Sequence, residues 1–382
     1  MNKRLHNLKR ICVVVLAVFV AISCSACFFF EGNTGNPGVE LRITPSQTQI
    51  VLGESVQLST NVTGDVLWVS LDDEIATVDE TGTVTALNLG TVTILALYSG
   101  AQAECEVTVV EPIGEKFTLI WHDEFDGETL DLTKWSYQYG TRDIYGNSTG
   151  PANWGNNELQ YYREENVRLE DGMLVITAQK ESEKIGGKSF TSGRITSRGN
   201  FFTLYGYVEA RIKLPGVSGL WPAFWMLPQP TSITQTGNEY GGWARNGELD
   251  IMEARGRIVT EVDTTLHFGG SYPQNDYRSK KAYLDTPITE WHTYAVDWRK
   301  EYIAWIVDGV ETFRLTYEQW WTASVDKEDN PYAPFDKPFY ILLNLAVGGT
   351  YDTTGANEIK ENESFTSASM YVDYVRVYAL NQ

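Results

Sequence analysis

The chain has 382 residues, with 30 Lys and Arg against 50 Asp and Glu, so its formal net charge is −20. This length predicts two or three domains. Aromatic residues make up 13% of the chain and charged residues 21%, which excludes an intrinsically disordered chain, since such chains have few aromatics and many charges. The acidity argues against DNA or RNA as a partner, because phosphate binding needs a basic surface. Many aromatics with excess carboxylates suit a neutral polar ligand such as a glycan.

The first 27 residues predict an export signal that is not part of the fold. Basic residues within residues 1–10 precede an apolar run over residues 11–22, and this run is shorter than the roughly 20 residues that a membrane-spanning helix needs. A basic start, a short apolar run and small residues after it are typical of a secretory signal. Either Cys24 or Cys27 resembles the lipid-accepting cysteine of a bacterial lipoprotein signal, with plain secretion as the alternative. We therefore expect an extracellular or cell-surface protein that is lipid-anchored through one of them.

Residues 28–38 are polar and rich in Gly and Asn, which predicts a flexible tether. Beyond this tether Cys105 is the one remaining cysteine, so we expect neither an internal disulfide nor a cysteine–histidine zinc site. Cys105 itself is predicted to be a small buried residue of a strand and not a nucleophile.

Residues 39–111 predict a first β domain. Short β-rich runs alternate with Gly, Asp and Asn, as in a β-sandwich. The segment resembles the bacterial Ig-like domain of the group-2 type through Trp68-Val69-Ser70, Ile75-Ala76-Thr77-Val78 and Gly82-Thr83-Val84-Thr85-Ala86. The resemblance implies a spacer or adhesive module on a cell-surface protein.

Residues 115–382 predict a second, larger all-β domain. The boundary falls at residues 111–114, because Pro112 cannot continue a strand ladder. Strand-like alternation then runs to the end of the chain, and Asp308-Gly309 between two alternating runs predicts a tight hairpin. Helical periodicity is confined to residues 317–321. A β domain of this size fits a jelly roll.

The segment Gly247-Glu248-Leu249-Asp250-Ile251-Met252-Glu253 carries three carboxylates. Strand side chains alternate, so Glu248 and Asp250 share one face while the apolar residues between them face the core. A regular strand would put Glu253 on the wrong face. One extra residue in a β-bulge, most simply at Met252, returns Glu253 to the face of the other two carboxylates.

Three aligned carboxylates predict acid–base chemistry. Glu248 and Glu253 can bring their carboxyl groups to about 5–6 Å, the separation used in retaining glycoside hydrolysis. At about 5.5 Å and an effective dielectric near 20, two such charges repel by about 3 kcal/mol, or roughly two pKa units. One glutamate should therefore stay protonated near neutral pH, as a general acid must. The alternative is a solvated acidic strand face.

The run Glu248–Glu253 resembles the E-x-D-x-x-E signature of glycoside hydrolase family 16 in its bulged, laminarinase-like form. Relatives with the shorter E-x-D-x-E include lichenases and xyloglucan transglycosylases. The resemblance covers about residues 117–382 and implies a concanavalin-like β-jelly roll. It also implies that Glu248 is the nucleophile, that Glu253 is the acid/base, and that Asp250 hydrogen-bonds the nucleophile.

The resemblance extends to residues around the carboxylates. Trp221 and Trp225, in Gly219–Pro228, match the family's tryptophan strand and would stack on sugar rings, with a core position as the alternative. His267 would lie near the acid/base as a hydrogen-bond partner. The other substrate-binding candidates in matching segments are Asn157, Arg194, Trp243, Arg245 and Asn344.

Many members of this family carry a calcium ion on the convex side, away from the cleft. Its ligands would correspond to Glu124, the carbonyl group of Gly172, and Asp373. Oxygen ligands of this kind suit a hard cation.

Taken together, the sequence predicts a monomeric, secreted or surface-anchored endo-β-1,3-glucanase that retains anomeric configuration and needs no organic cofactor or catalytic metal. The nearer alternative is the same chemistry on mixed-linkage glucan or on a β-galactan such as agar or keratan, because loops set the substrate on a shared fold. Trp243 and Arg245 favour β-1,3-glucan. The farther alternative is a non-catalytic glucan-binding protein, although such relatives typically lose the glutamates. Transglycosylation stays open.

Overall fold

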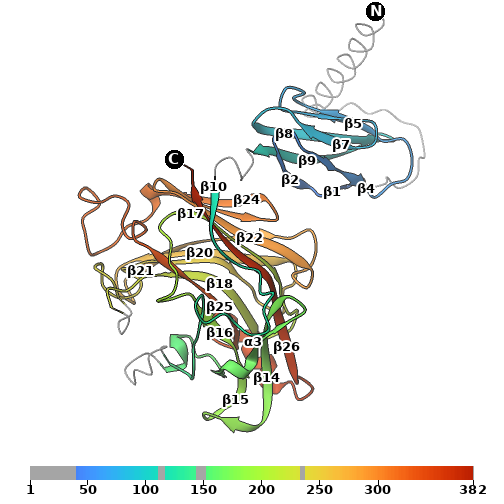
Figure 1. Ribbon diagram of the computed structural model, residues 1–382. Coiled ribbons are helices and arrows are strands. Elements are labelled where there is room, and N and C mark those ends of the chain that lie inside the picture. Colours follow the sequence, from blue (N-terminus) through green and yellow to red (C-terminus); the bar gives the residue numbers. More distant parts are fainter. Residues whose placement is uncertain (1–39, 111–116, 143–151, 233–236, 382) are drawn as a thin grey trace, which may run out of the picture. The chain divides into compact units, whose positions relative to one another are not determined.

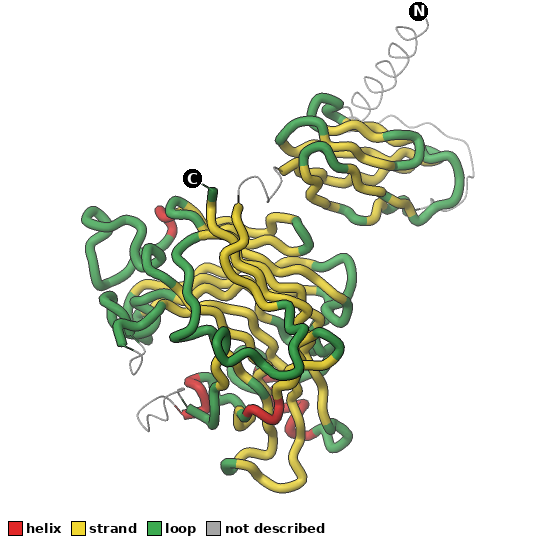
Figure 2. Tube along the Cα trace, in the orientation of Figure 1, coloured by secondary structure: helices red, strands yellow, loops and turns green. Residues whose placement is uncertain are grey.

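The computed structural model describes residues 40–110, 117–142, 152–232 and 237–381 (Figure 1). The predicted signal with Cys24 and Cys27, the tether, and the predicted boundary at residues 111–114 lie outside the described residues. Strands dominate the described part of the chain (Figure 2). No helix in that part is both long enough and apolar enough to cross a bilayer.

The N-terminal strands form three small sheets around one core, which confirms the predicted β-sandwich. The sheet orders are β2-β9-β8-β5, β3-β7-β6 and β1-β4. Trp68 and Cys105 are buried in this core, and burial raises the pKa of the Cys105 thiol to about 12, as expected for an unreactive strand cysteine. The strands are β1 (Ile43–Thr44), β2 (Gln47–Val51), β3 (Ser55–Gln57), β4 (Ser59–Thr60), β5 (Leu67–Ser70), β6 (Ala76–Val78), β7 (Thr83–Ala86), β8 (Gly90–Tyr98) and β9 (Ala101–Val110).

The C-terminal strands form two large sheets. The first has ten strands in the order β12-β15-β14-β26-β17-β22-β23-β24, with β10 paired to β26 and β13 paired to β14. Its strands are β10 (Phe117–Asp123), β12 (Gln160–Tyr162), β13 (Val167–Glu170), β14 (Met173–Ile185), β15 (Lys188–Ser192), β17 (Gly206–Lys213), β22 (Trp291–Trp298), β23 (Tyr302–Val307), β24 (Val310–Thr316) and β26 (Ser367–Leu380).

The second sheet has seven strands in the order β11-β16-β25-β18-β19-β20-β21. Its strands are β11 (Ser136–Tyr137), β16 (Arg194–Thr196), β18 (Leu220–Pro228), β19 (Glu248–Glu253), β20 (Glu261–Gly269), β21 (Asn275–Tyr283) and β25 (Phe339–Val347). Apolar side chains of both sheets pack into a single buried cluster, so the predicted two-layer jelly roll is confirmed (Figure 1). The face of the seven-stranded sheet that points away from this cluster is called the site face below.

The connections agree with the sequence in part. Asp308 and Gly309 join β23 to β24 with φ of 50° and 78°, the positive angles that a tight hairpin turn requires. The helical signal at residues 317–321 corresponds to a short 3₁₀ helix, η3 (Tyr317–Gln319). Two other 3₁₀ segments are η1 (Ala152–Gly155) and η2 (Glu164–Asn166).

The helix α3 (Thr353–Glu361) was not predicted from the sequence. Its polar composition hides the weak periodicity of its few buried residues, Gly355, Ala356 and Ile359. Asp352 caps it by accepting a hydrogen bond from the backbone N–H of Gly355.

The core between the two large sheets should dominate the stability of the C-terminal domain. Phe224 on β18 is fully buried in it, so Phe224→Ala is expected to lower the free energy of unfolding by about 3–5 kcal/mol. Urea unfolding followed by tryptophan fluorescence measures this change. The matched control is Tyr283→Ala at a side chain that is 72% exposed, where we expect a change within about 0.5 kcal/mol. Equal losses in the two variants would contradict the packing described here.

Candidate active site

The bulge in β19 places all three carboxylates on the site face. Leu249, Ile251 and Met252 belong to the core cluster, although the last two are consecutive. Against β18, Trp225 pairs with Asp250 and Phe224 pairs with Met252, so Ile251 is the extra residue. The register against β20 is likewise interrupted between Asp250 and Glu253. The predicted bulge is therefore present, one position earlier than its simplest placement.

Cross-strand register brings the other predicted residues to the same face. His267 on β20 lies directly opposite Glu248. Asn344 on β25 pairs with Ala223, which in turn pairs with Glu253. Directly opposite residues of adjacent strands point to the same face, so these side chains form rows across the sheet.

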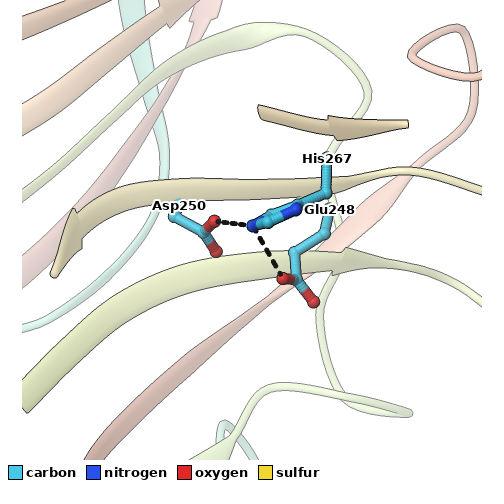
Figure 3. A group of neighbouring side chains, drawn as sticks. All are labelled: Glu248, Asp250 and His267. Carbon is cyan, nitrogen blue, oxygen red and sulfur yellow. Dashed lines mark ion pairs between the residues drawn. The ribbon is translucent and has the colours of Figure 1, made fainter. Parts of the chain in front are cut away.

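His267 contacts Glu248 and Asp250 (Figure 3). Its Nε2 lies 3.4 Å from Asp250 Oδ2 and 3.8 Å from Glu248 Oε1. The sequence placed His267 near Glu253; the register sets it opposite Glu248, and its imidazole also acts on the pKa of Glu253. One ligand atom from each of these three side chains lies within 4.8 Å of the others, and among the described residues this is the group of acidic and imidazole side chains that could hold a cation.

Two tryptophans donate hydrogen bonds to the glutamates. Trp243 Nε1 lies 3.1 Å from Glu248 Oε2, and Trp221 Nε1 lies 2.8 Å from Glu253 Oε1. An N–H donor favours the ionised carboxylate, so each indole opposes the effect of burial on its glutamate. Both tryptophans were predicted to contact substrate. The structure shows in addition that each donates a hydrogen bond to a glutamate.

Arg194 is enclosed by aromatic rings. Its guanidinium carbon lies 4.4 Å from the ring centroid of Trp154 and 4.8 Å from that of Trp225. Its Nε donates to Gln138, and only 7% of the residue is exposed. Trp225 also donates from Nε1 to Asn344 Oδ1 at 2.8 Å. Arg194 and Asn344 thus hold Trp225 in place, a role that the sequence did not indicate.

The remaining two candidates lie on loops. Asn157 is exposed and has a left-handed backbone with φ of 57°. Arg245 is half-buried, and its Nη2 lies 3.4 Å from the carbonyl oxygen of Ala323, while its own carbonyl group accepts from Thr322. Arg245 therefore ties the loop before β19 to the segment after η3.

Burial dominates the electrostatics of the carboxylates. Burial first, and the negative charge of Asp250 second, raise the pKa of Glu248 and of Glu253 to about 8. Burial also raises the pKa of Asp250 well above its ordinary value. The imidazole of His267 opposes the shift at both glutamates. The raised pKa suits Glu253 as the proton donor, whereas Glu248 must ionise to act as a nucleophile, a state that His267 and the Trp243 N–H favour.

Three further residues of this region escaped the sequence analysis. Asp263 on β20 lies directly opposite Glu253, and Tyr351, which follows β25, donates a hydrogen bond to Asp263. Glu158 is buried and hydrogen-bonded by Tyr162 Oη at 3.2 Å, and burial raises its pKa. Asp263 lies in a strand of mixed polar and apolar residues and Tyr351 in a loop, so no spacing rule links either residue to the carboxylate triad.

The predicted calcium ligands have other partners in this structure. Arg376 donates to both carboxylate oxygens of Glu124, at 3.0 and 2.8 Å. Arg211 pairs with Asp373 at 2.8 Å. Gly172 lies in the turn between β13 and β14 with φ of 73°. Both carboxylates are engaged by guanidinium groups, which does not fit a shared calcium site in this arrangement. Calcium binding by these residues therefore has no support here and stays a prediction from the sequence.

Comparison with known proteins identifies the family. The model for glycosyl hydrolases family 16 matches residues 154–375, and that for the bacterial Ig-like domain (group 2) matches residues 40–109. The chain is similar to glucan endo-1,3-beta-glucosidase A1 of Niallia circulans, with 40% identity over 286 residues, covering 71% of this chain and 39% of that protein. It is 36% identical to the glucan endo-1,3-beta-glucosidase of Cryptopygus antarcticus, covering 69% and 93% of the two chains.

A solved structure gives the same result. The laminarinase from Rhodothermus marinus matches with a TM-score of 0.57 and 35% identity, covering 70% of this chain and 98% of that one. The chain therefore belongs to glycosyl hydrolases family 16 and is a glycoside hydrolase that also carries a bacterial Ig-like domain.

The raised pKa of Glu248 makes a prediction about stability. A carboxyl with a pKa of about 8 when folded and about 4.5 when unfolded binds its proton more tightly in the folded state. Stability is therefore lost as the pH rises from about 4.5 to 8. Glu248→Gln removes this penalty, so its Tm should exceed that of the wild type at pH 8 by about 3 °C or more, and the gap should close toward pH 4.

Thermal unfolding at the two pH values measures this difference. Glu363→Gln, at an exposed site, is the control and should show the same Tm as the wild type at both. A lower Tm for Glu248→Gln than for the wild type at pH 8 would contradict a raised pKa.

Proposed function

We propose that this protein is a retaining endo-β-1,3-glucanase. The observation that carries the proposal is the bulged strand β19, which aligns Glu248, Asp250 and Glu253 on one face. Two carboxyl groups of raised pKa on one strand, each hydrogen-bonded by an indole N–H, supply a nucleophile and a proton donor. The names of the relatives from Niallia circulans and Cryptopygus antarcticus support β-1,3-glucan as the substrate.

In the first half of the reaction, Glu248 attacks the anomeric carbon while Glu253 gives its proton to the departing glycosidic oxygen. A covalent bond forms to the Glu248 carboxylate as the glycosidic bond breaks. Trp243 holds the attacking carboxylate through Nε1, and His267 lies 3.8 Å from its other oxygen and 3.4 Å from Asp250.

In the second half, Glu253 is ionised and takes a proton from water. The resulting hydroxide attacks the anomeric carbon, releases Glu248, and restores the starting configuration after two inversions. The Trp221 indole N–H stabilises the ionised state of Glu253 that this step requires. Neither half of the reaction calls on an organic cofactor, and both are built from side chains of this chain.

The proposal is tested by reducing-end release from a soluble β-1,3-glucan. The wild type should release reducing ends, and Glu248→Gln should lower kcat/KM by about 10⁴-fold or more, because the covalent step is lost. NMR of the first product should show the β-anomer, as retention requires. Glu363→Gln, at an exposed site outside β19, is the control and should keep wild-type activity.

Three outcomes would contradict the proposal in different ways. Release of reducing ends only from mixed-linkage glucan or from a galactan would change the assigned substrate but leave the proposed mechanism in place. Binding of glucan without release would make the protein a binding module. An α-anomer as first product would replace retention by inversion.

We also propose that the protein is exported and held at the cell surface by a lipid on Cys24 or Cys27. The support is the basic and then apolar start of the chain, followed by small residues around both cysteines. A lipid chain transfers a protein into a detergent phase, so detergent phase partition separates the lipidated from the free form.

Two matched variants test this anchor. The variants are Cys24→Ser and Cys27→Ser. The variant that lacks the lipidated cysteine should partition into the aqueous phase, and the other should stay in the detergent phase. If the wild type itself stays in the aqueous phase, the lipid anchor is excluded and plain secretion takes its place.

A further inference from the structure

Tyr351 lies in the short segment between β25 and α3, and this segment is fixed at several points. The backbone N–H of Gly348 donates to the carbonyl group of Gly219 at 2.7 Å, and that of Thr350 donates to Asn156 at 2.8 Å. Asp352 pairs with Arg257 at 2.8 Å and caps α3. Tyr351 therefore has little freedom to move.

The segment is pressed against Trp221. The ring of Tyr351 stacks on the Trp221 indole, with centroids 4.8 Å apart and planes 22° apart. A Cβ on Gly349 would lie 2.9 Å from Trp221 Cζ3, and Gly349 has a φ of 96°, so glycine is required for this approach. The same indole donates its N–H to Glu253 Oε1 at 2.8 Å.

Asp263 fixes the other end of Tyr351. The phenol group of Tyr351 donates a hydrogen bond to Asp263 Oδ2, and Arg255 Nη2 donates to the same oxygen at 3.0 Å. Asp263 faces Glu253 directly across the β19–β20 pairing. A chain of contacts thus runs from Asp263 through Tyr351 and Trp221 to Glu253.

We infer that Tyr351 is a positioning residue for the acid/base Glu253: it clamps the Trp221 indole so that its N–H meets the carboxylate, while Asp263 holds Tyr351 through its phenol group. The inference rests on the proposed role of Glu253. Tyr351 lies outside the carboxylate strand β19, and two contacts, the stacking on Trp221 and the Trp221 hydrogen bond, separate it from the Glu253 oxygen. Tyr351 does not need to touch the substrate for this role.

The charges around Glu253 set the direction of the effect. They come from its own strand, from β20, from the segment after β19 and from the segment after β25: Glu248, Asp250, Asp263, His267, Arg255 and Tyr351. The Trp221 hydrogen bond lowers the pKa of Glu253, whereas the negative charge of Asp263 raises it. Loss of the clamp and loss of the Asp263 charge should therefore shift this pKa in opposite directions.

The direct test is a ¹³C NMR titration of the full chain with labelled glutamate side chains, in which Glu253→Gln identifies the Glu253 signal. Tyr351→Leu removes the stacking ring and should raise the pKa of Glu253 by about 0.5 to 1 unit. Asp263→Asn should lower it. Tyr351→Phe keeps the ring and should give a smaller shift than Tyr351→Leu.

Tyr374→Leu is the matched control. Tyr374 also donates to a half-buried carboxylate, Glu209 Oε1 at 2.8 Å, but on the ten-stranded sheet. Its loss should lower Tm and leave the Glu253 signal unchanged. Circular dichroism shows that each variant is folded.

Kinetics distinguish positioning of the proton donor from simple substrate binding. Tyr351→Leu should lower kcat on β-1,3-glucan at least about tenfold, since proton transfer contributes about 10²–10⁴-fold. It should have little effect on kcat/KM for a dinitrophenyl β-glucan oligosaccharide, because that leaving group departs without protonation and kcat/KM reports the first half of the reaction. The alkaline limb of the pH profile should move upward with the NMR value.

Two results would overturn the inference. One is an unchanged Glu253 titration in folded Tyr351→Leu, and the other is a rise in KM alone with kcat and the alkaline limb intact. Failure of the wild type to cleave β-1,3-glucan is a separate outcome: it would remove the proposed substrate, while the NMR titration would still decide whether Tyr351 acts on Glu253.

Discussion

One extra residue in β19 is the constraint on which the site depends. Because Ile251 and Met252 both enter the core, Glu253 returns to the face that carries Glu248 and Asp250. The ten-stranded sheet supports this irregular backbone, since Trp305 Nε1 donates to the carbonyl oxygen of Asp250 at 2.8 Å. The same core that stabilises the fold therefore fixes the spacing of the carboxylates.

Clustering three carboxyl groups in a buried place is costly, and the surroundings offset that cost only in part. Burial and mutual repulsion hold protons on the cluster, whereas two indole N–H groups and His267 favour ionisation. A site balanced in this way can move a proton near neutral pH, which a fully exposed or fully paired carboxylate cannot do. The tryptophans thus serve electrostatics as well as contact with a sugar.

Outside β19, aromatic residues organise the site face in pairs. Arg194 holds Trp225, which pairs with Asp250, and Tyr351 stacks on Trp221, which hydrogen-bonds Glu253. Each tryptophan also hydrogen-bonds a residue of the sheet, Asn344 or Glu253. Rings fixed on both the face and the edge lose little further entropy when a ligand arrives, which favours a preformed site.

The sequence by itself determined the all-β class, the two β domains, the hairpin at Asp308-Gly309 and the three carboxylates with their bulge, because period-2 alternation and its one interruption are local properties. Only the tertiary structure decided that His267 lies opposite Glu248, that Arg194 is enclosed by tryptophans, that Asp263 lies opposite Glu253, and that Tyr351 stacks on Trp221. These contacts join strands and loops far apart in the chain. They follow from strand order and cross-strand register, which no local pattern of residues encodes.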